Sequence, residues 1–285
     1  MVKFDIRTWV DENHEQRPFR QAVYTILTAI SGNPDLRTDM ILKGGILLAL
    51  GYESTRFTKD IDFSTATKTK DFDVDQYISQ FEGALFDAVE QLDYGLDCRV
   101  QSHRQNPPGE DKTFPTIQMK VGYADKGNAG AHRRLMAKKS SQVVHVDHSL
   151  NEPTGTPEVF EIGDGKCIRV YSFYDLVGEK FRALLQQEVR RQIRPQDIYD
   201  LYFLLYEHPL RDDASTKQQI LRSLKEKAAA RNLEVKKESM QNPEIIRRSE
   251  VQYDQLKILI VGELPPFSEV YAAMRVYYEG LPWDA

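Results

Sequence analysis

The chain has 285 residues, of which 41% are hydrophobic and 28% charged, and its formal net charge at pH 7 is -5. This composition is typical of a soluble globular protein, and the length allows one large domain or two smaller ones. The acidic balance excludes a globally basic nucleic-acid coat protein, although it is compatible with a local basic patch.

Cysteine content and hydropathy indicate a cytoplasmic protein. Cys98 and Cys167 are the only cysteines, and they lie far apart without metal-binding spacing. The N-terminus is broken up by charges and lacks the apolar core of a secretory signal. No stretch approaches the ~18 apolar residues that a membrane helix needs, so we expect no membrane contact.

The order of apolar patterns predicts an α/β part followed by a helical part, with the break near residue 170. We expect helices over residues 18–30, 46–50 and 75–92, and strands over residues 57–63, 97–101, 116–123, 142–149 and 167–171. The glycine-rich, basic stretch 126–139 (KGNAGAHRRLMAKK) is predicted to be a loop. Further helices are expected over residues 173–190, 195–206 and 216–230, with less regular segments after them.

An acidic pair lies on the strand predicted over residues 57–63. Asp60 and Asp62 are two residues apart, so both carboxylates project to one face, while Ile61 and Phe63 project to the other. Adjacent carboxylates repel one another unless a cation lies between them, and hard divalent cations prefer such oxygen ligands. Most isolated pairs of this kind are nevertheless solvated surface acids, so the context decides.

That context is a double glycine upstream of the acidic strand. Gly44 and Gly45 separate a short predicted strand from a predicted buried helix. Glycine lets a backbone approach phosphate closely, and the N-terminus of a helix offers N–H groups to phosphate oxygens. The order of strand, double glycine, helix and acidic strand therefore predicts a site for a nucleoside triphosphate and a divalent metal.

The segment LKGGILLALGYESTRFTKDIDFS resembles the first motif of DNA polymerase β-type nucleotidyltransferases, in the version found in the AbiEii/AbiGii toxin family. The resemblance runs from about residue 42 to residue 205. It implies a polymerase-β-like α/β core with a mixed sheet, followed by a C-terminal helical region. Gly45 stands where many superfamily members have serine, so backbone donors must replace a serine hydroxyl at the phosphates.

Three later segments match the other motifs of the family. In VHVDHSLNE, Asp147 would be a third carboxylate that completes the metal site or deprotonates the acceptor; taken alone it reads as an ordinary strand-end acid. In SFYDLVGEKFRALLQQ, Lys180 occupies the apolar stripe of a helix, where a lysine needs an anion unless it snorkels to solvent. The resemblance makes Lys180 the lysine that neutralises the triphosphate.

The fourth segment, RPQDIYDLYFLL, places Asp197 and Asp200 three residues apart on one helix face. The resemblance marks both as lining the active site, whereas Asp197 alone could simply stabilise the helix N-terminus. Arg194 could bind either an acid or a phosphate. We expect Glu179 and Arg182 to be solvated neighbours of Lys180.

These features predict a nucleotidyltransferase that uses Mg²⁺ or Mn²⁺ and an NTP, with residues 1–170 as the α/β core and residues 171–285 completing the active site. Asp60, Asp62 and Asp147 would bind metal, and Gly44, Gly45, Lys180 and Arg194 would bind the nucleotide. The resemblance further implies a toxin of a toxin–antitoxin or phage-resistance system, an antitoxin partner and an RNA acceptor such as a tRNA 3′ end. A small-molecule or protein acceptor, or an inactive nucleotide-binding or partner-binding module, remain as alternatives.

The basic residues of stretch 126–139 leave two interpretations open. Arg133, Arg134, Lys138 and Lys139 precede the segment that carries Asp147, with His132 beside them. They could guide a triphosphate or an RNA backbone, or they could form a solvated hairpin.

Overall fold

The computed structural model describes residues 2–109, 112–206 and 208–284. By its internal contacts the chain divides into two compact units. Unit 1 contains the chain up to Gly51 together with Thr58–Val170, and unit 2 contains Tyr52–Phe57 together with the chain from Tyr171. The chain therefore leaves unit 1 at Tyr52, contributes six residues to unit 2, and returns to unit 1 at Thr58.

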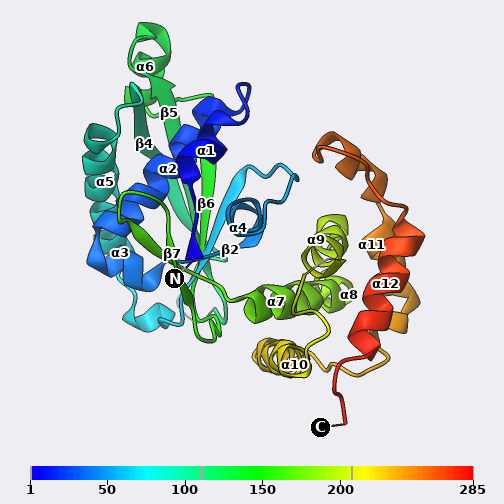
Figure 1. The fold of residues 1–285 in the computed structure, drawn as a ribbon. Helices are drawn as coiled ribbons and strands as arrows, with labels where there is room; N and C mark the ends of the chain where they lie inside the picture. Colours follow the sequence, from blue (N-terminus) through cyan, green and yellow to red (C-terminus); the bar gives the residue numbers. More distant parts are fainter. Residues whose placement is uncertain (1, 110–111, 207, 285) are drawn as a thin grey trace. The chain divides into compact units, whose positions relative to one another are not determined.

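Unit 1 is built on one mixed β-sheet, which Figure 1 shows as a twisted layer. The described strands are β1 (Val2–Lys3), β2 (Ile41–Lys43), β3 (Asp60–Ser64), β4 (Leu96–Asn106), β5 (Thr116–Asp125), β6 (Val143–Ser149), β7 (Glu158–Glu161) and β8 (Cys167–Val170). Their order across the sheet is β1-β7-β8-β2-β3-β6-β5-β4. Strands β3 and β6 pair in parallel, and β3 pairs with β2 in antiparallel fashion.

Six α-helices belong to the described part of unit 1, and the two longest cover one face of its sheet. The helices are α1 (Ile6–Asp11), α2 (Arg17–Gly32), α3 (Pro34–Asp39), α4 (Gly44–Gly51), α5 (Val74–Gln91) and α6 (Ala129–Met136). The long amphipathic helices α2 and α5 pack against each other and against β4 (Figure 1). Their apolar sides bury residues such as Leu27 and Phe81, which are 0% exposed, and so build the core of the unit.

Strand alternation separates that core from a polar face. Along β3, Ile61 and Phe63 are fully buried, whereas Asp60 is exposed and Asp62 is half-buried. The same alternation continues through β6 and β5, because residues paired across neighbouring strands share a face. The sheet face opposite α2 and α5 therefore carries Asp60, Asp62, His145, Asp147, Gln118 and Lys120.

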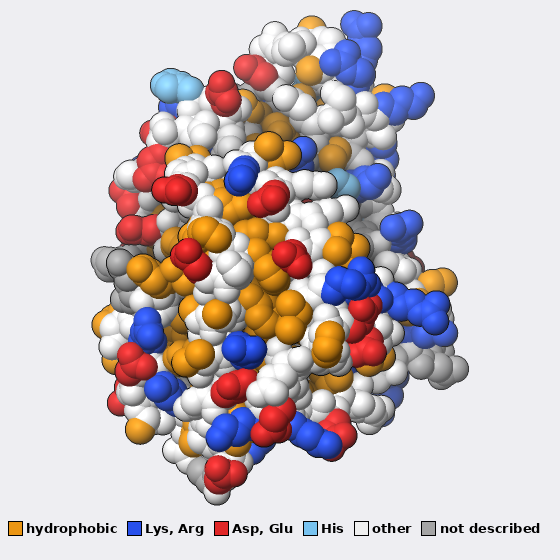
Figure 2. All heavy atoms as spheres, turned by 90° about the vertical axis from the view of Figure 1, so that its right-hand side faces the viewer, with side chains coloured by type: hydrophobic (Ala, Val, Ile, Leu, Met, Phe, Trp, Pro, Cys, Tyr) orange, Lys and Arg blue, Asp and Glu red, His pale blue; other side chains and the backbone are white. Residues whose placement is uncertain are grey.

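Unit 2 is helical. Its helices are α7 (Phe173–Leu185), α8 (Gln187–Arg190), α9 (Pro195–Tyr206), α10 (Ala214–Ala229), α11 (Pro243–Glu250) and α12 (Phe267–Glu279). Helix α7 packs on α10 and α9. The segment Tyr52–Phe57 joins them through a β-bridge between Arg56 and Ile260, beside which the Phe57 N–H donates to the Leu259 carbonyl at 2.6 Å. Figure 2 shows one face of the protein, on which apolar side chains lie among scattered acids and bases.

Most predicted elements are confirmed, but several differ from the prediction in type or in bounds. Stretch 126–139 was predicted to be a loop, which is wrong, because it contains α6. The strand predicted over residues 57–63 begins only at Asp60, since residues 55–57 bond instead to residues 259–261 of unit 2. The helix predicted over residues 173–190 is divided at Gln186 into α7 and α8. In the part of the chain that is described, no helix is both long and apolar enough to span a membrane.

Candidate active site

The double glycine turns the chain from β2 into α4 directly beside the acidic strand. Gly44 has a φ of +73°, in the left-handed region that favours glycine. A Cβ atom at Gly44 would lie 2.2 Å from Oδ2 of Asp62, and one at Gly45 would lie 2.8 Å from Cγ2 of Thr58. Both positions are therefore too closely packed for a side chain, which explains the glycine pair in physical terms.

Three carboxylates occupy the polar face of the sheet at this point. Asp60 and Asp62 both project from β3, and Asp62 lies opposite Asp147 in the parallel pairing of β3 with β6. Lys43, the last residue of β2, lies opposite Asp62 on the other side. Asp62 is thus flanked by a carboxylate on one strand and a cation on the next.

Asp147 lies in an environment that disfavours its negative charge. Burial raises its pKa most, and the nearby charge of Asp60 raises it further. Gln118 on β5 opposes these effects, because its amide lies 3.3 Å and 3.4 Å from the two carboxylate oxygens. His145 and Lys43 also favour the charged form. A cation bound at this face would relieve the repulsion between Asp60 and Asp147.

The residue types on this face fit a magnesium-type ion. Carboxylate oxygens are the ligands that Mg²⁺ prefers, and it is commonly bound by one or two of them together with water and substrate phosphates. Within the described residues, no three His, Cys, Asp or Glu side chains gather closely enough to bind a metal ion by themselves. Asp60 and Asp62 would supply only two ligands to such an ion, and the others would have to come from phosphate and water.

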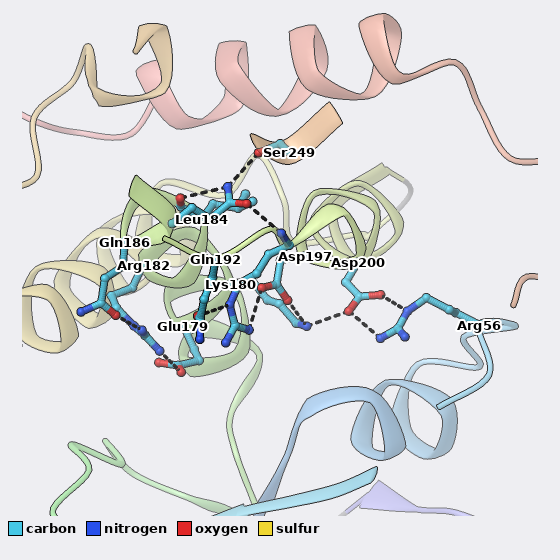
Figure 3. A network of polar contacts seen from close by, with 12 residues as sticks. Arg56, Glu179, Lys180, Arg182, Leu184, Gln186, Gln192, Asp197, Asp200 and Ser249 are labelled. Atoms are coloured by element: carbon cyan, nitrogen blue, oxygen red, sulfur yellow. Dashed lines mark hydrogen bonds and ion pairs between the residues drawn. The ribbon is translucent and has the colours of Figure 1, made fainter. Parts of the chain in front are cut away.

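A second polar cluster lies inside unit 2 and is centred on Lys180 of α7 (Figure 3). The Lys180 ammonium donates to Oδ1 of Asp197 and to Oδ2 of Asp200, each at 2.7 Å. The three side chains are 11%, 4% and 0% exposed. The anion that a lysine on an apolar stripe requires is therefore supplied by two carboxylates of α9.

Two arginines complete this cluster. Arg56 holds Asp200 with two bonds, from Nε at 2.7 Å and Nη2 at 2.8 Å, in the bidentate geometry that suits guanidinium and carboxylate. Arg194 donates from Nη1 to Asp197 at 3.2 Å. Arg56 was not predicted, because a single arginine in a loop carries no sequence signal for a partner 144 residues away.

The electrostatics of the Lys180 cluster keep Lys180 and Asp197 charged. Burial by itself would lower the pKa of Lys180, but Asp197 and Asp200 raise it above its ordinary value. Burial would likewise raise the pKa of Asp197, but Lys180 and Arg194 hold it below its ordinary value. The charges of Lys180 and Asp197 are thus retained in the interior by their partners.

The neighbours of Lys180 on α7 differ from expectation. Arg182 was predicted to be solvated, which is wrong, because it is only 6% exposed and donates to Oε1 of Gln186 at 2.6 Å. It also forms an ion pair with Glu179, one helical turn away, whose side chain is 17% exposed. Helix α7 is surrounded by unit 2, so its polar residues find partners inside the protein.

The predicted site residues thus fall into two sets, each within its own unit. Unit 1 brings together Gly44, Gly45, Asp60, Asp62 and Asp147 on the polar face of its sheet. Unit 2 brings together Lys180, Arg194, Asp197 and Asp200 around one buried ammonium group. That both sets serve one substrate stays a prediction.

Comparison with known families decides the identity of the chain. The model of the AbiEii family, described as nucleotidyl transferase AbiEii toxin of type IV toxin–antitoxin systems, matches residues 25–273. The chain belongs to this family. The resemblance seen in the sequence is thereby confirmed, and the protein is a nucleotidyltransferase of the toxin class, with an NTP as substrate and an antitoxin as the expected partner. No curated protein matches the chain.

Solved structures share the fold. A candidate nucleotidyltransferase from H. pylori is 16% identical with a TM-score of 0.55, covering 94% of both chains. JHP933 from Helicobacter pylori is also 16% identical, with a TM-score of 0.54 over 94% of this chain and 91% of its own. MenT4, a nucleotidyltransferase toxin from Mycobacterium tuberculosis H37Rv, is 16% identical with a TM-score of 0.54, over 96% and 87%. The predicted fold class, a polymerase-β-like α/β nucleotidyltransferase, is confirmed.

Proposed function

We propose that this AbiEii nucleotidyltransferase transfers a nucleoside monophosphate from an NTP to the 3′ hydroxyl of an RNA, with tRNA as the preferred acceptor class. The reaction forms a bond between the acceptor oxygen and the α-phosphorus of the NTP. It breaks the bond between that phosphorus and the β-phosphate oxygen, so pyrophosphate leaves and the acceptor proton is released.

The observation that carries the proposal is the pairing of Asp62 with Asp147 across β3 and β6, with Gly44 packed against Asp62. Gly44 and Gly45 would bind the phosphates through backbone N–H groups at the start of α4. Asp60 and Asp62, helped by Asp147, would hold Mg²⁺ or Mn²⁺, which would neutralise phosphate charge when bound. Asp147 would also accept the proton of the acceptor hydroxyl.

Residues 171–285 complete the active site in this proposal. Lys180 would add positive charge at the triphosphate, since the Lys180 cluster of three cations and two carboxylates carries a net charge of about +1. Asp197 and Asp200 would orient that ammonium, and Arg194 could bind a phosphate oxygen. Action against phage infection and a cytoplasmic location are parts of the same proposal.

The test is transfer of label from each of four NTPs labelled at the α-phosphorus. Wild-type protein is incubated with total RNA, purified tRNA or an RNA-free metabolite extract, in the presence of Mg²⁺. We expect label at RNA 3′ ends, and its loss by at least ~10²-fold in Asp60→Asn and Asp62→Asn, because each removes a carboxylate that would hold the metal ion at the reacting phosphates. Asp71→Asn, which changes an exposed acid elsewhere in unit 1, is the matched control.

Other outcomes would change the proposal. Label found only in the metabolite extract would make the acceptor a small molecule. Absence of transfer from wild-type protein to any acceptor would contradict RNA transfer altogether. Full activity in Asp60→Asn protein with an unchanged melting temperature would contradict the assignment of the carboxylates.

A further inference from the structure

An uninterrupted basic segment lies between strands β5 and β6 of an otherwise acidic chain. Residues 126–142 contain Lys126, Arg133, Arg134, Lys138 and Lys139 and no Asp or Glu, whereas the whole chain has a net charge of -5. The segment includes helix α6 and the turn after it. Figure 1 labels α6 at the top of unit 1, and Figure 2 shows several Lys and Arg side chains at its upper edge.

Four of these cations have no acidic partner among the described residues. Lys126 pairs with Glu90 at 3.1 Å, but the exposed side chains of Arg133, Arg134, Lys138 and Lys139 make no hydrogen bond or ion pair there. We call these four residues the α6 cations. Exposed arginines elsewhere do find carboxylates, as between Arg222 and Glu226 or Arg247 and Glu244.

The helix that carries the α6 cations is firmly held on the sheet. Asn128 caps its N-terminus by accepting from the Ala131 N–H at 3.0 Å, and Leu135 is fully buried beneath it. Gln101 of β4 donates to the Leu135 carbonyl at 3.3 Å and accepts from the Ser140 N–H at 3.1 Å. The α6 cations are therefore presented by a fixed element.

Helix α6 packs on the same face of the sheet as the acidic residues. The turn after the helix approaches Gly122, where a Cβ atom would lie 2.9 Å from the Cβ of Ser140. Gly122 is two and four residues from Lys120 and Gln118 on β5, so all three share the face that bears Asp147. Val143, which follows the turn, precedes Asp147 by four strand residues, or about 13 Å.

We propose that the α6 cations bind the phosphate backbone of the RNA acceptor while its 3′ end lies at the acidic residues. The inference rests on the proposed function and names the surface that would select a polynucleotide. Helix α6 is about 12 Å long at 1.5 Å per residue, so its exposed side could lie along only a few consecutive phosphates of one strand. Exposed Lys120 and Arg104 on the same face continue the basic surface towards Asp147.

The expected size of the effect follows from counter-ion release. Each phosphate neutralised on a single strand contributes about -0.7 to the slope of log K against log salt. Removing two of the α6 cations should therefore reduce the slope by about 1.4 and weaken binding by about 25-fold at 0.1 M salt.

The test uses the full chain carrying Asp60→Asn, which prevents turnover. Binding of a fluorescein-labelled RNA hairpin with a single-stranded 3′ end is followed by anisotropy from about 50 to 200 mM salt. For R133A/R134A and for K138A/K139A we expect about 25-fold weaker binding at 0.1 M salt and a slope of log K against log salt that is smaller by about 1.4. The double variant K68A/K70A, which removes two exposed lysines elsewhere in unit 1, is the matched control and should bind as the parent does.

A second measurement uses the same pairs in the active enzyme. The KM for RNA should rise while kcat and the affinity for NTP stay unchanged, because in this proposal the α6 cations bind the acceptor and not the triphosphate. Unchanged RNA affinity and slope in both α6 variants would overturn the proposal, and so would equal losses in K68A/K70A. If the α6 variants still bind RNA but no longer bind poly-glutamate, a probe for acidic proteins, the α6 cations would instead be assigned to an acidic protein partner. Because anisotropy needs no turnover, it still reports on α6 if transfer to RNA fails.

Discussion

The charge network around Asp200 should be a main support of unit 2, and replacing this residue by asparagine measures it. Asp200 is 0% exposed and accepts three charge-assisted hydrogen bonds, two from Arg56 and one from Lys180, at 2.7–2.8 Å. Asp200→Asn keeps the shape but leaves two buried cations facing a neutral amide. Removing one partner of a buried ion pair costs about 3–5 kcal/mol, so we expect the free energy of unfolding to fall by that amount.

Thermal unfolding of unit 2 can be followed separately. Of the two tryptophans, Trp9 lies in unit 1 and Trp283 in unit 2, so a Trp9→Phe background makes Trp283 fluorescence a reporter of unit 2. The predicted loss corresponds to a fall in melting temperature of about 10–20 °C for a domain of this size. The far-ultraviolet circular dichroism at room temperature should stay that of a folded protein.

A surface ion pair provides the control. Asp212 also faces an arginine and a lysine, at 3.2 Å each, but its side chain is 70% exposed. Asp212→Asn should change the free energy of unfolding by less than about 1 kcal/mol, because solvent screens the pair. A loss below about 1 kcal/mol in Asp200→Asn as well would refute the reasoning, since burial would then add nothing to the pair.

Four further predictions concern the site. Gly44→Ala should abolish transfer, because the new Cβ would push aside the carboxylate of Asp62. Gly83→Ala lies in open space on α5, so thermal unfolding should show a free energy of unfolding higher by about 0.5–1 kcal/mol. The Asp197 carboxyl has a folded-state pKa below its ordinary 3.8, so its contribution is present above about pH 4 and is lost as pH falls through the folded pKa; urea unfolding of Asp197→Asn should lack this loss. A chelator should stop transfer in a label assay, and added Mg²⁺ or Mn²⁺ should restore it. Lys180→Met and Arg56→Met should both destabilise, but only Lys180→Met should weaken NTP binding by calorimetry; equal NTP affinities would confine Lys180 to the buried network.

Local signals explain why much of the fold could be predicted from the sequence. The apolar run on both sides of Gly44-Gly45 specified a strand, a turn and a helix, and the structure has β2 and α4 there. Helix α9 begins and ends at the predicted residues, because Pro195 favours a first helical turn and apolar spacing continues to Tyr206. Where apolar spacing, glycine and proline all favour the same conformation, the residues of a segment are sufficient to predict its secondary structure.

Elements that depend on distant partners could not be predicted in this way. Helix α6 contains a glycine and three basic or imidazole side chains in eight residues, and it is stabilised by Leu135 buried against the sheet and by contacts from Gln101 on β4. Strand β7 is four residues long, and one of its partners is the two-residue strand β1, which lies more than 150 residues earlier in the sequence. In both cases tertiary contacts outweigh local propensity.

The same distinction applies to the candidate site. The spacing of Asp60 and Asp62 predicted a shared face without any tertiary information, since strand alternation alone requires it. The position of Lys180 on an apolar stripe predicted an anion, but the sequence could not show that Asp197 and Asp200 supply it. The need for a partner is thus a property of the segment, whereas the choice of partner is a property of the fold.

Arg56 links the Lys180 cluster to the chain segment between the Gly44-Gly45 turn and the strand that carries Asp60 and Asp62. The chain leaves unit 1 after α4 and returns to it at Thr58, two residues before Asp60, and the segment between belongs to unit 2. Arg56 is fixed there by Asp200, which Lys180 holds from the other side. The glycine turn and the acidic strand are therefore joined by a segment whose anchor is the buried lysine cluster. A lysine that only neutralised phosphate would not need two buried carboxylates, so we infer that Lys180 also has this structural task.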